Sequence, residues 1–157
     1  MSDSEIGDES HSVRGSVDRG ALLDFREAVV RREPLATGEL DYFLDPSVLY
    51  IHFEDGVSEA GSGRLDVVWT TQDDYNIHYT DETRNLRWDV HPHEYPTPPE
   101  DRHFHPPPDA SRDPDLVEDS CIEVSEIVLV ALATLKLWRT AYEWGSFDGV
   151  NEIVNPP

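Results

Sequence analysis

The sequence predicts an α+β domain, in which an antiparallel sheet of four or five strands carries an N-terminal helix and a long C-terminal helix on one face. Three observations predict this class. Apolar residues recur at helical spacing near both ends of the chain, strand-like alternation fills the middle, and Asp- and Glu-containing turns separate the strands. A chain of 157 residues favours a single domain with a substantial hydrophobic core.

The first helix is expected over residues 17–32, after an acidic tail of residues 1–15 whose polar composition predicts disorder. Ser16 precedes this helix as a candidate N-cap, and Pro34 ends the helical pattern. Three apolar residues share one helical face: Leu22, Phe25 and Val29. The segment therefore has the pattern of an amphipathic helix that docks on the sheet.

Strand-like alternation and turn signals occur in five segments: residues 38–45, 47–56, 64–72, 75–81 and 84–90. The second segment has an apolar face that should point into the core: Leu49, Ile51 and Phe53. In the last segment Trp88 should enter the core, while Arg87 and Asp89 take the opposite, polar face. Whether His78 meets them there depends on strand register, which the sequence does not give.

The C-terminal third begins with seven prolines between residues 92 and 108, so we expect an extended loop there rather than a helix or a central strand. Ser120 and Glu123 then form a capping box before a long helix over residues 121–144. Apolar residues cover most of this helix, which predicts packing against the sheet and against the first helix or a partner chain. The folded domain would span residues 16–145, followed by an irregular tail at 146–157.

The charge of the chain is strongly negative, with 33 acidic against 12 basic residues and a net charge of −21. Lys136 is its single lysine. This composition predicts a halophilic, archaeal host, because concentrated salt screens such self-repulsion. The single cysteine excludes an intrachain disulfide and a Cys-rich zinc site. A start without a secretory signal and no apolar run long enough for a bilayer predict a cytoplasmic protein without membrane contact.

Residues 87–105, RWDVHPHEYPTPPEDRHFH, hold four of the seven histidines: His91, His93, His103 and His105. The stretch Arg87-Trp88-Asp89, then Pro92-His93, then His103-x-His105 resembles the TumE-type toxins of prokaryotic toxin–antitoxin modules. The resemblance covers about residues 40–140 and is distinctive over 84–105. Val90 replaces the usual Asn of that family, and Asp101 and Arg102 replace the Pro and His expected before the last His-x-His. His91 falls at a variable position of the motif.

This resemblance implies a small cytoplasmic toxin that is encoded beside a DNA-binding antitoxin. Ribonuclease activity enters by analogy, since RNA cleavage is common among such toxins. Breaking a phosphodiester through the 2′-hydroxyl needs a base, an acid and a cation for the developing charge. Imidazole can do either proton transfer near neutral pH, and a guanidinium offers forked donors to phosphate.

We therefore predict a metal-independent ribonuclease site in which Arg87 binds phosphate and Asp89 orients an imidazole. Three histidines would share the acid, base and positioning roles: His93, His103 and His105. Four further residues are candidates for contacting substrate, by stacking on a base or by charge: His78, Tyr79, Tyr95 and Arg102. No resident cofactor is expected under this hypothesis.

Other hypotheses stay open beside it. The two His-x-His pairs, with Asp89 or Glu94, could instead bind a divalent metal such as Zn, Mn or Ni, although their spacing matches no standard zinc module. The toxin could also act without catalysis, by binding a protein, with the apolar C-terminal helix as its interface and Trp138, Tyr142 and Trp144 as its anchors. A homodimer is compatible with that helix as well. The histidines could finally be polar loop residues without a chemical role.

Overall fold

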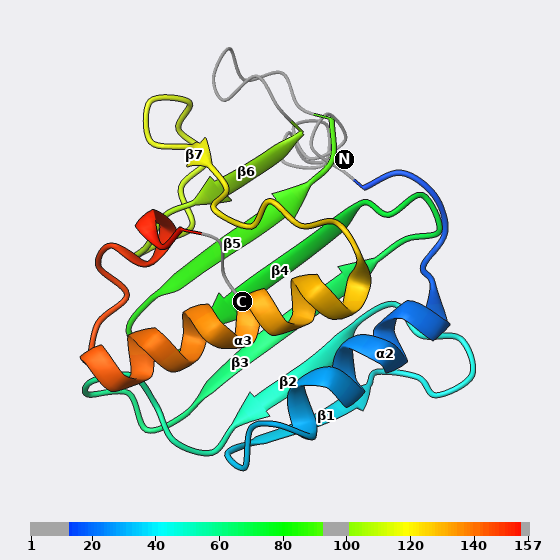
Figure 1. The fold of residues 1–157 in the computed structure, drawn as a ribbon, viewed down its shortest axis with the longest axis horizontal. Coiled ribbons are helices and arrows are strands. Elements are labelled where there is room, and N and C mark those ends of the chain that lie inside the picture. The colour runs from blue at the N-terminus through cyan, green and yellow to red at the C-terminus, as the bar shows by residue number, and fades with distance from the viewer. Residues whose placement is uncertain (1–12, 93–100, 155–157) are drawn as a thin grey trace, which may run out of the picture.

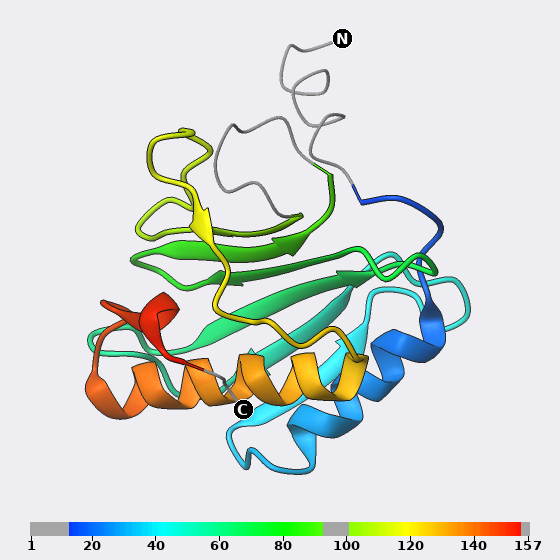
Figure 2. The ribbon, with the colours of Figure 1, turned by 45° about the horizontal axis from the view of Figure 1, so that its top comes forward.

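The computed structural model describes residues 13–92 and 101–154. Within these residues the chain forms one seven-stranded antiparallel sheet, whose strands lie side by side in the order in which they occur in the sequence (Figure 1). Figure 2 shows two layers, with both α-helices against the same face of the sheet. The α+β class and the placement of the helices on one face therefore agree with the sequence analysis.

Seven strands make up the sheet: β1 (Ala36–Leu40), β2 (Leu49–Phe53), β3 (Gly63–Trp69), β4 (Tyr75–Thr80), β5 (Asn85–Val90), β6 (Arg102–His105) and β7 (Glu118–Asp119). The described helical elements are α2 (Arg19–Val30), α3 (Ile127–Trp144) and the short 3-10 helix η1 (Val150–Glu152). The long helix α3 is thus not the last helical element, because η1 follows it. Phe147 and Val150, in the segment expected to be an irregular tail, are buried against the core.

The prediction of four or five strands is wrong, because β6 and β7 extend the sheet. β6 lies within the proline-rich stretch that was expected to be a loop, and it pairs with β5 on one side and β7 on the other. Its four residues contain no proline, so every backbone N–H remains able to join the ladder. The prolines flank this strand instead of interrupting it, and the strand carries two of the candidate site residues.

Both helices begin later than the sequence predicts. Asp18, not Ser16, caps α2, and its Oδ1 accepts a hydrogen bond from the backbone N–H of Ala21 at 3.0 Å. Glu126, not Ser120, caps α3 by accepting from the N–H of Leu129 at 3.1 Å. The Ser120 hydroxyl accepts instead from the N–H of Ile122, two residues on. Such a local turn competes with a capping box for the same hydroxyl, which explains the shifted start.

The core lies between the helices and one face of the sheet. The alternation predicted for β2 is observed, since Leu49, Ile51 and Phe53 are at most 1% exposed. Trp138 of α3 stacks on Phe53 with ring centroids 3.9 Å apart and the planes 6° from parallel. The predicted apolar face of α2 is buried as well: Leu22, Phe25 and Val29. Because this face carries the apolar side chains, the alternate residues of each strand occupy the opposite face.

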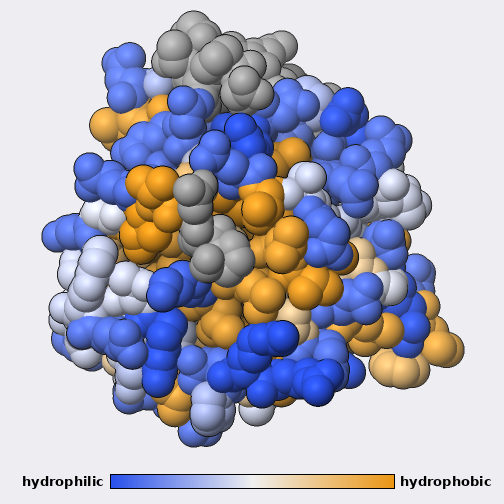
Figure 3. Space-filling model, viewed as in Figure 1, coloured by the Kyte–Doolittle hydropathy of each residue, from blue (hydrophilic) through white to orange (hydrophobic). Residues whose placement is uncertain are grey.

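On the helix-bearing side, hydrophobic residues gather over α3 and are framed by hydrophilic ones (Figure 3). Leu129 is 42% exposed and Trp144 is 59% exposed, while Trp138 lies in the core. Trp138 was one candidate anchor for an interface along this helix, and its burial assigns it to the core instead. In the part of the chain that the structure describes, no helix is both long and apolar enough to cross a membrane.

Candidate functional site

Strand register brings the polar residues of the RWD segment to the histidines of β6. Asp89 lies directly opposite His103, and Arg87 lies opposite His105. On the other side, Arg87 faces His78 of β4 and Asp89 faces Asn76. Because successive side chains alternate between faces, all of these residues belong to the face that the helices leave uncovered. Trp88 points to the core, as expected, and is 1% exposed.

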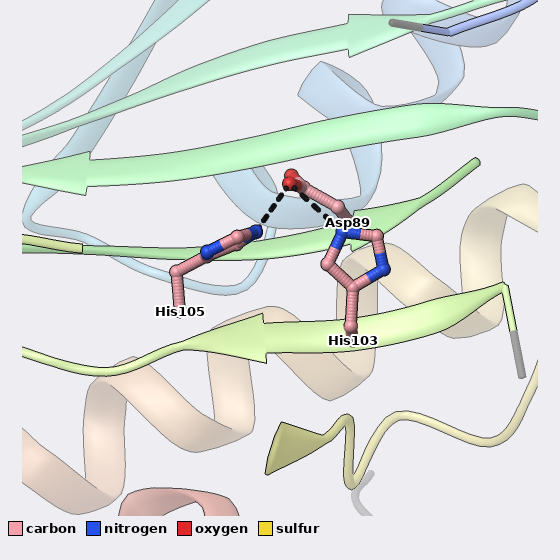
Figure 4. A group of neighbouring side chains, drawn as sticks. All are labelled: Asp89, His103 and His105. Carbon is pink, nitrogen blue, oxygen red and sulfur yellow. Dashed lines mark ion pairs between the residues drawn. The ribbon is translucent and has the colours of Figure 1, made fainter. Parts of the chain in front are cut away.

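One carboxylate oxygen is the centre of the cluster. Asp89 Oδ2 lies 3.2 Å from His105 Nε2, 3.5 Å from His103 Nε2 and 3.5 Å from His91 Nε2. Figure 4 shows the imidazoles of His103 and His105 rising from β6 toward this carboxylate on β5. All four side chains are buried, with at most 1% of their surface exposed. We call these four residues the Asp/His cluster.

The backbone fixes the orientation of each imidazole. Every Nδ1 atom lies within hydrogen-bond distance of a carbonyl oxygen: His91 with Pro92 at 2.9 Å, His103 with Asp101 at 3.0 Å, and His105 with Ser111 at 2.7 Å. A carbonyl oxygen can only accept, so each Nδ1 carries the proton. The three Nε2 atoms are thereby presented to Asp89.

Two further side chains hold the Asp89 carboxylate. Arg87 Nε donates to Oδ2 at 2.7 Å, and Asn76, with its amide nitrogen turned toward β5, donates to Oδ1 at 2.9 Å. The Arg87 side chain is 16% exposed, whereas the side chains of the Asp/His cluster are almost completely buried. Arg87 is therefore easier to reach for solvent, or for a phosphate group, than the side chains of the Asp/His cluster.

The charges of the cluster shift two pKa values in a defined direction. Burial by itself raises the pKa of the Asp89 carboxyl, but the three imidazoles and the positive charge of Arg87 lower it more, so the pKa lies well below its ordinary value. Burial lowers the pKa of the His103 imidazole; Asp89 raises it, and the two neighbouring imidazoles lower it again. The balance leaves the pKa of His103 below its ordinary value, so Asp89 is ionised and His103 is neutral at neutral pH.

The structure brings together Arg87, Asp89, His103 and His105 among the predicted catalytic residues. His93 and Tyr95 lie outside the described residues. His78 is on the same face as the cluster, where its Nε2 lies 3.0 Å from Asn85 Oδ1.

Two predicted substrate contacts are placed elsewhere. Tyr79 is 1% exposed on the helix-covered face, and its hydroxyl donates to Asp81. The Arg102 guanidinium donates to the backbone carbonyl of Glu123 at 2.8 Å. Tyr79 is therefore not positioned to stack on a base, because the core surrounds its ring, and Arg102 does not contribute its charge to the cluster.

The ribonuclease site predicted from the sequence left out two residues that lie here, His91 and Asn76. Arg87, Asp89 and His91 are spaced by two residues, which places them on one face of an extended chain. The backbone N–H of His91 indeed continues the ladder by donating to the carbonyl of Asp101. The spacing of two residues could therefore have identified His91 as a member of the site. Asn76 had no such signal, because its contact depends on the register between β4 and β5.

The cluster offers two kinds of chemistry. Imidazoles oriented by a carboxylate can accept and donate protons, and Arg87 beside them can bind an anion. The same nitrogen and oxygen atoms are also metal-ligand types, and the ligand atoms of Asp89, His103 and His105 all lie within 4.8 Å of one another. Both uses depend on side chains from β5 and β6, which the sheet holds in fixed relative positions.

Comparison with known proteins matched one family model and no individual protein. No curated protein and no solved structure matches the chain. The family model described as "Toxin TumE" matches residues 26–132, which include the last residues of α2, the whole sheet and the first residues of α3. Because this match covers more than half of the 157 residues, the chain belongs to the TumE toxin family.

Proposed function

We propose that this protein is the toxin of a toxin–antitoxin pair and inhibits growth by acting on RNA at the face of β4, β5 and β6. Family membership supports the toxin role. The observation that carries the RNA proposal is the convergence of three imidazoles and Arg87 on Asp89. These are the groups that a phosphodiester reaction needs for proton transfer and for charge stabilisation.

Arg87 is proposed to bind the phosphate, because it is more exposed than the Asp/His cluster and a guanidinium presents several donors to an anion. Asp89 is proposed to orient the imidazoles, in agreement with its central position. His103 and His105 are proposed to act on the 2′-hydroxyl and the leaving 5′-oxygen, together with His93, which lies outside the described residues.

Arg87→Ala tests the site with a matched control, Arg64→Ala. Arg64 lies on the same face of the sheet and pairs with Asp66, yet it does not contact the cluster. We expect induced wild-type protein and the Arg64→Ala variant to arrest growth and to fragment total cellular RNA. The Arg87→Ala variant should allow growth at the rate of an empty-vector strain, because the phosphate loses its cation.

Circular dichroism of both variants verifies that they fold. A folded Arg87→Ala variant as toxic as the wild type would exclude this role of Arg87. His105→Ala is a second test of the site and should also abolish toxicity. If the wild type arrests growth and leaves RNA intact in cells and in a purified assay, the toxin acts by binding a protein, and the RNA proposal fails.

The family implies an antitoxin partner. We propose that this partner is a DNA-binding protein encoded beside the toxin and that the complex forms in the cytoplasm. Co-expression with the neighbouring gene should restore growth and yield a complex that elutes as one species in size-exclusion chromatography. The same measurement on the toxin alone tests whether it forms a homodimer.

A further inference from the structure

The Asp/His cluster brings nitrogen and oxygen atoms of metal-ligand type close together. Each imidazole has its Nδ1–H directed at a backbone carbonyl, so Nε2 is the nitrogen turned toward Asp89. The three Nε2 atoms lie 3.2 to 3.5 Å from Asp89 Oδ2. Imidazole nitrogens and a carboxylate oxygen are ligands that divalent transition metals accept.

The separations are long for direct hydrogen bonds from the imidazoles to the carboxylate. Asp89 Oδ2 already accepts from Arg87 Nε at 2.7 Å. The three Nε2 atoms lie at 3.2 to 3.5 Å, beyond the roughly 2.7–2.9 Å expected for charge-assisted N–H···O bonds.

A metal ion satisfies the same geometry. In a tetrahedral site with bonds of about 2.0–2.1 Å, neighbouring ligand atoms are about 3.3–3.4 Å apart. Asp89 Oδ2 lies 3.2 Å from His105 Nε2 and 3.5 Å from His103 Nε2, close to these edges. The ligand atoms of Asp89, His103 and His105 stay within 4.8 Å of one another, so small rotations of the rings would close them on an ion.

The groups around the cluster are those that surround bound metals in proteins. A histidine that binds a metal through one nitrogen usually donates its other N–H to a carbonyl or carboxylate, and all three imidazoles here face a carbonyl in this way. The carboxylate is held in turn, with Asn76 on Oδ1 and Arg87 on Oδ2. Such contacts hold the ligand side chains in position before the ion binds, so less side-chain conformational entropy is lost on binding.

We propose that Asp89, His103 and His105 bind a divalent transition-metal ion, with Zn²⁺ a good match to one carboxylate oxygen, two imidazoles and water. His91, whose Nε2 also faces Asp89 Oδ2, lies beside this site. The inference stands on the geometry of the cluster and goes beyond the proposed action on RNA. In the metal-bound protein His103 and His105 would be ligands, so this inference changes one part of the proposed function. The proton transfers assigned to these two imidazoles would pass to water bound to the ion, while the role of Arg87 would stay the same.

The first experiment measures metal in untagged wild-type protein purified in high-salt buffer without chelator. We expect inductively coupled plasma mass spectrometry to find about one transition-metal ion per chain. Two variants accompany it. His103→Gln/His105→Gln removes two ligands and should contain almost no metal, whereas the control His52→Gln should retain it. His52 lies on the same face of the sheet but pairs with Glu39, away from the cluster.

A second measurement uses only the wild type, because the double variant could fail to fold. Removing the ion with a chelator should lower the Tm, and adding Zn²⁺ back should restore it, since the ion binds the folded chain. Co²⁺ added to the metal-free protein should give the visible absorption bands of a tetrahedral site. Metal-free wild type whose Tm and Co²⁺ spectrum do not respond to added ion would overturn the proposal.

These results are independent of the growth assay. The Arg87→Ala variant should still bind metal while it loses toxicity, because Arg87 contacts the carboxylate and is not a ligand. Metal binding without any effect on RNA would leave this site in place and remove the proposed function. Toxicity in a protein that binds no metal would overturn the metal site and leave the proposed function in place.

Discussion

At the scale of single residues, two buried carboxylates receive most of the charge contacts on the uncovered side of the sheet. Asp89 is the centre of the Asp/His cluster, and Asp74 is held by Arg14. The backbone N–H, Nε and Nη2 of Arg14 donate to the Asp74 carboxylate at 2.8 to 3.0 Å. Asp74 thereby attaches the N-terminal segment of the described chain to the turn between β3 and β4.

Asp74→Asn should destabilise the protein by about 1–3 kcal/mol at neutral pH, because a buried acceptor loses its ionised form while Arg14 keeps its donors. Burial raises the pKa of Asp74, but the hydrogen bonds and charge of Arg14 lower it more, with a small contribution from His91, so the folded pKa is below its ordinary value. The stabilisation of the folded state by the ionised Asp74 carboxylate and Arg14 is therefore present above about pH 4. It is lost as the pH falls through the folded pKa of Asp74.

Chemical denaturation of the wild type and of Asp74→Asn, at neutral pH and at decreasing pH, measures this difference. The gap between their free energies of unfolding should shrink on acidification. Asp66→Asn is the control, because Asp66 pairs with Arg64 at the surface and its loss should cost about 0–1 kcal/mol. A gap for Asp74→Asn that grows as the pH falls would contradict the assigned direction of the shift.

At the scale of secondary-structure elements, the sheet positions the site on one face, and α3 covers the core on the opposite face. β5 and β6 supply Arg87, Asp89, His103 and His105 on one face, and their alternate residues Trp88 and Phe104 pack together on the other, with ring centroids 5.2 Å apart. The core on the helix side therefore fixes the strands that present the cluster. Loss of core packing at α3 should affect stability far more than loss of an exposed ring from the same helix.

Trp138→Ala should lower the free energy of unfolding by about 3–5 kcal/mol, because it removes a buried ring that stacks on Phe53 and leaves a cavity. Trp144→Ala is the matched control on the same helix. Its side chain is 59% exposed, so the change should stay within about 0.5 kcal/mol. Denaturant unfolding in high salt measures both values, and equal costs for the two tryptophans would contradict this account of the core.

At the scale of the whole molecule, the net charge of −21 acts on stability through self-repulsion. Added salt shortens the range of this repulsion, from about 10 Å at 0.1 M to about 3 Å at 1 M. We expect the Tm to rise steadily over this range of KCl, and thermal unfolding followed by circular dichroism measures it.

Sucrose at matched osmolality is the control for this prediction, because it also favours compact states but does not screen charge. A Tm that is insensitive to KCl, or that rises equally in sucrose, would argue against the halophilic adaptation that the composition predicts. The salt dependence concerns the surface as a whole, so the single-residue changes above should leave its slope nearly unchanged.

Much of this protein could be predicted from sequence because the relevant signals are local. Alternation along residues 47–56 and 84–90 determined which side chains of β2 and β5 enter the core, and helical spacing determined the buried face of α2. The RWD stretch and the paired histidines indicated both the family and four of the residues that meet in the site. Each of these patterns depends on neighbours only a few residues apart.

Tertiary structure decided the rest, since strand register depends on contacts between distant parts of the chain. Pairing of β5 with β6 brought three histidines and Asp89 into a buried cluster, with His91 among them, and left out Tyr79 and Arg102. Each ring faces one backbone carbonyl, of Pro92, Asp101 or Ser111, and this contact places the proton of the ring on Nδ1. The sequence by itself determined which residues have the chemistry, and the folded sheet alone decided that their nitrogens face one oxygen, because only long-range pairing can set that geometry.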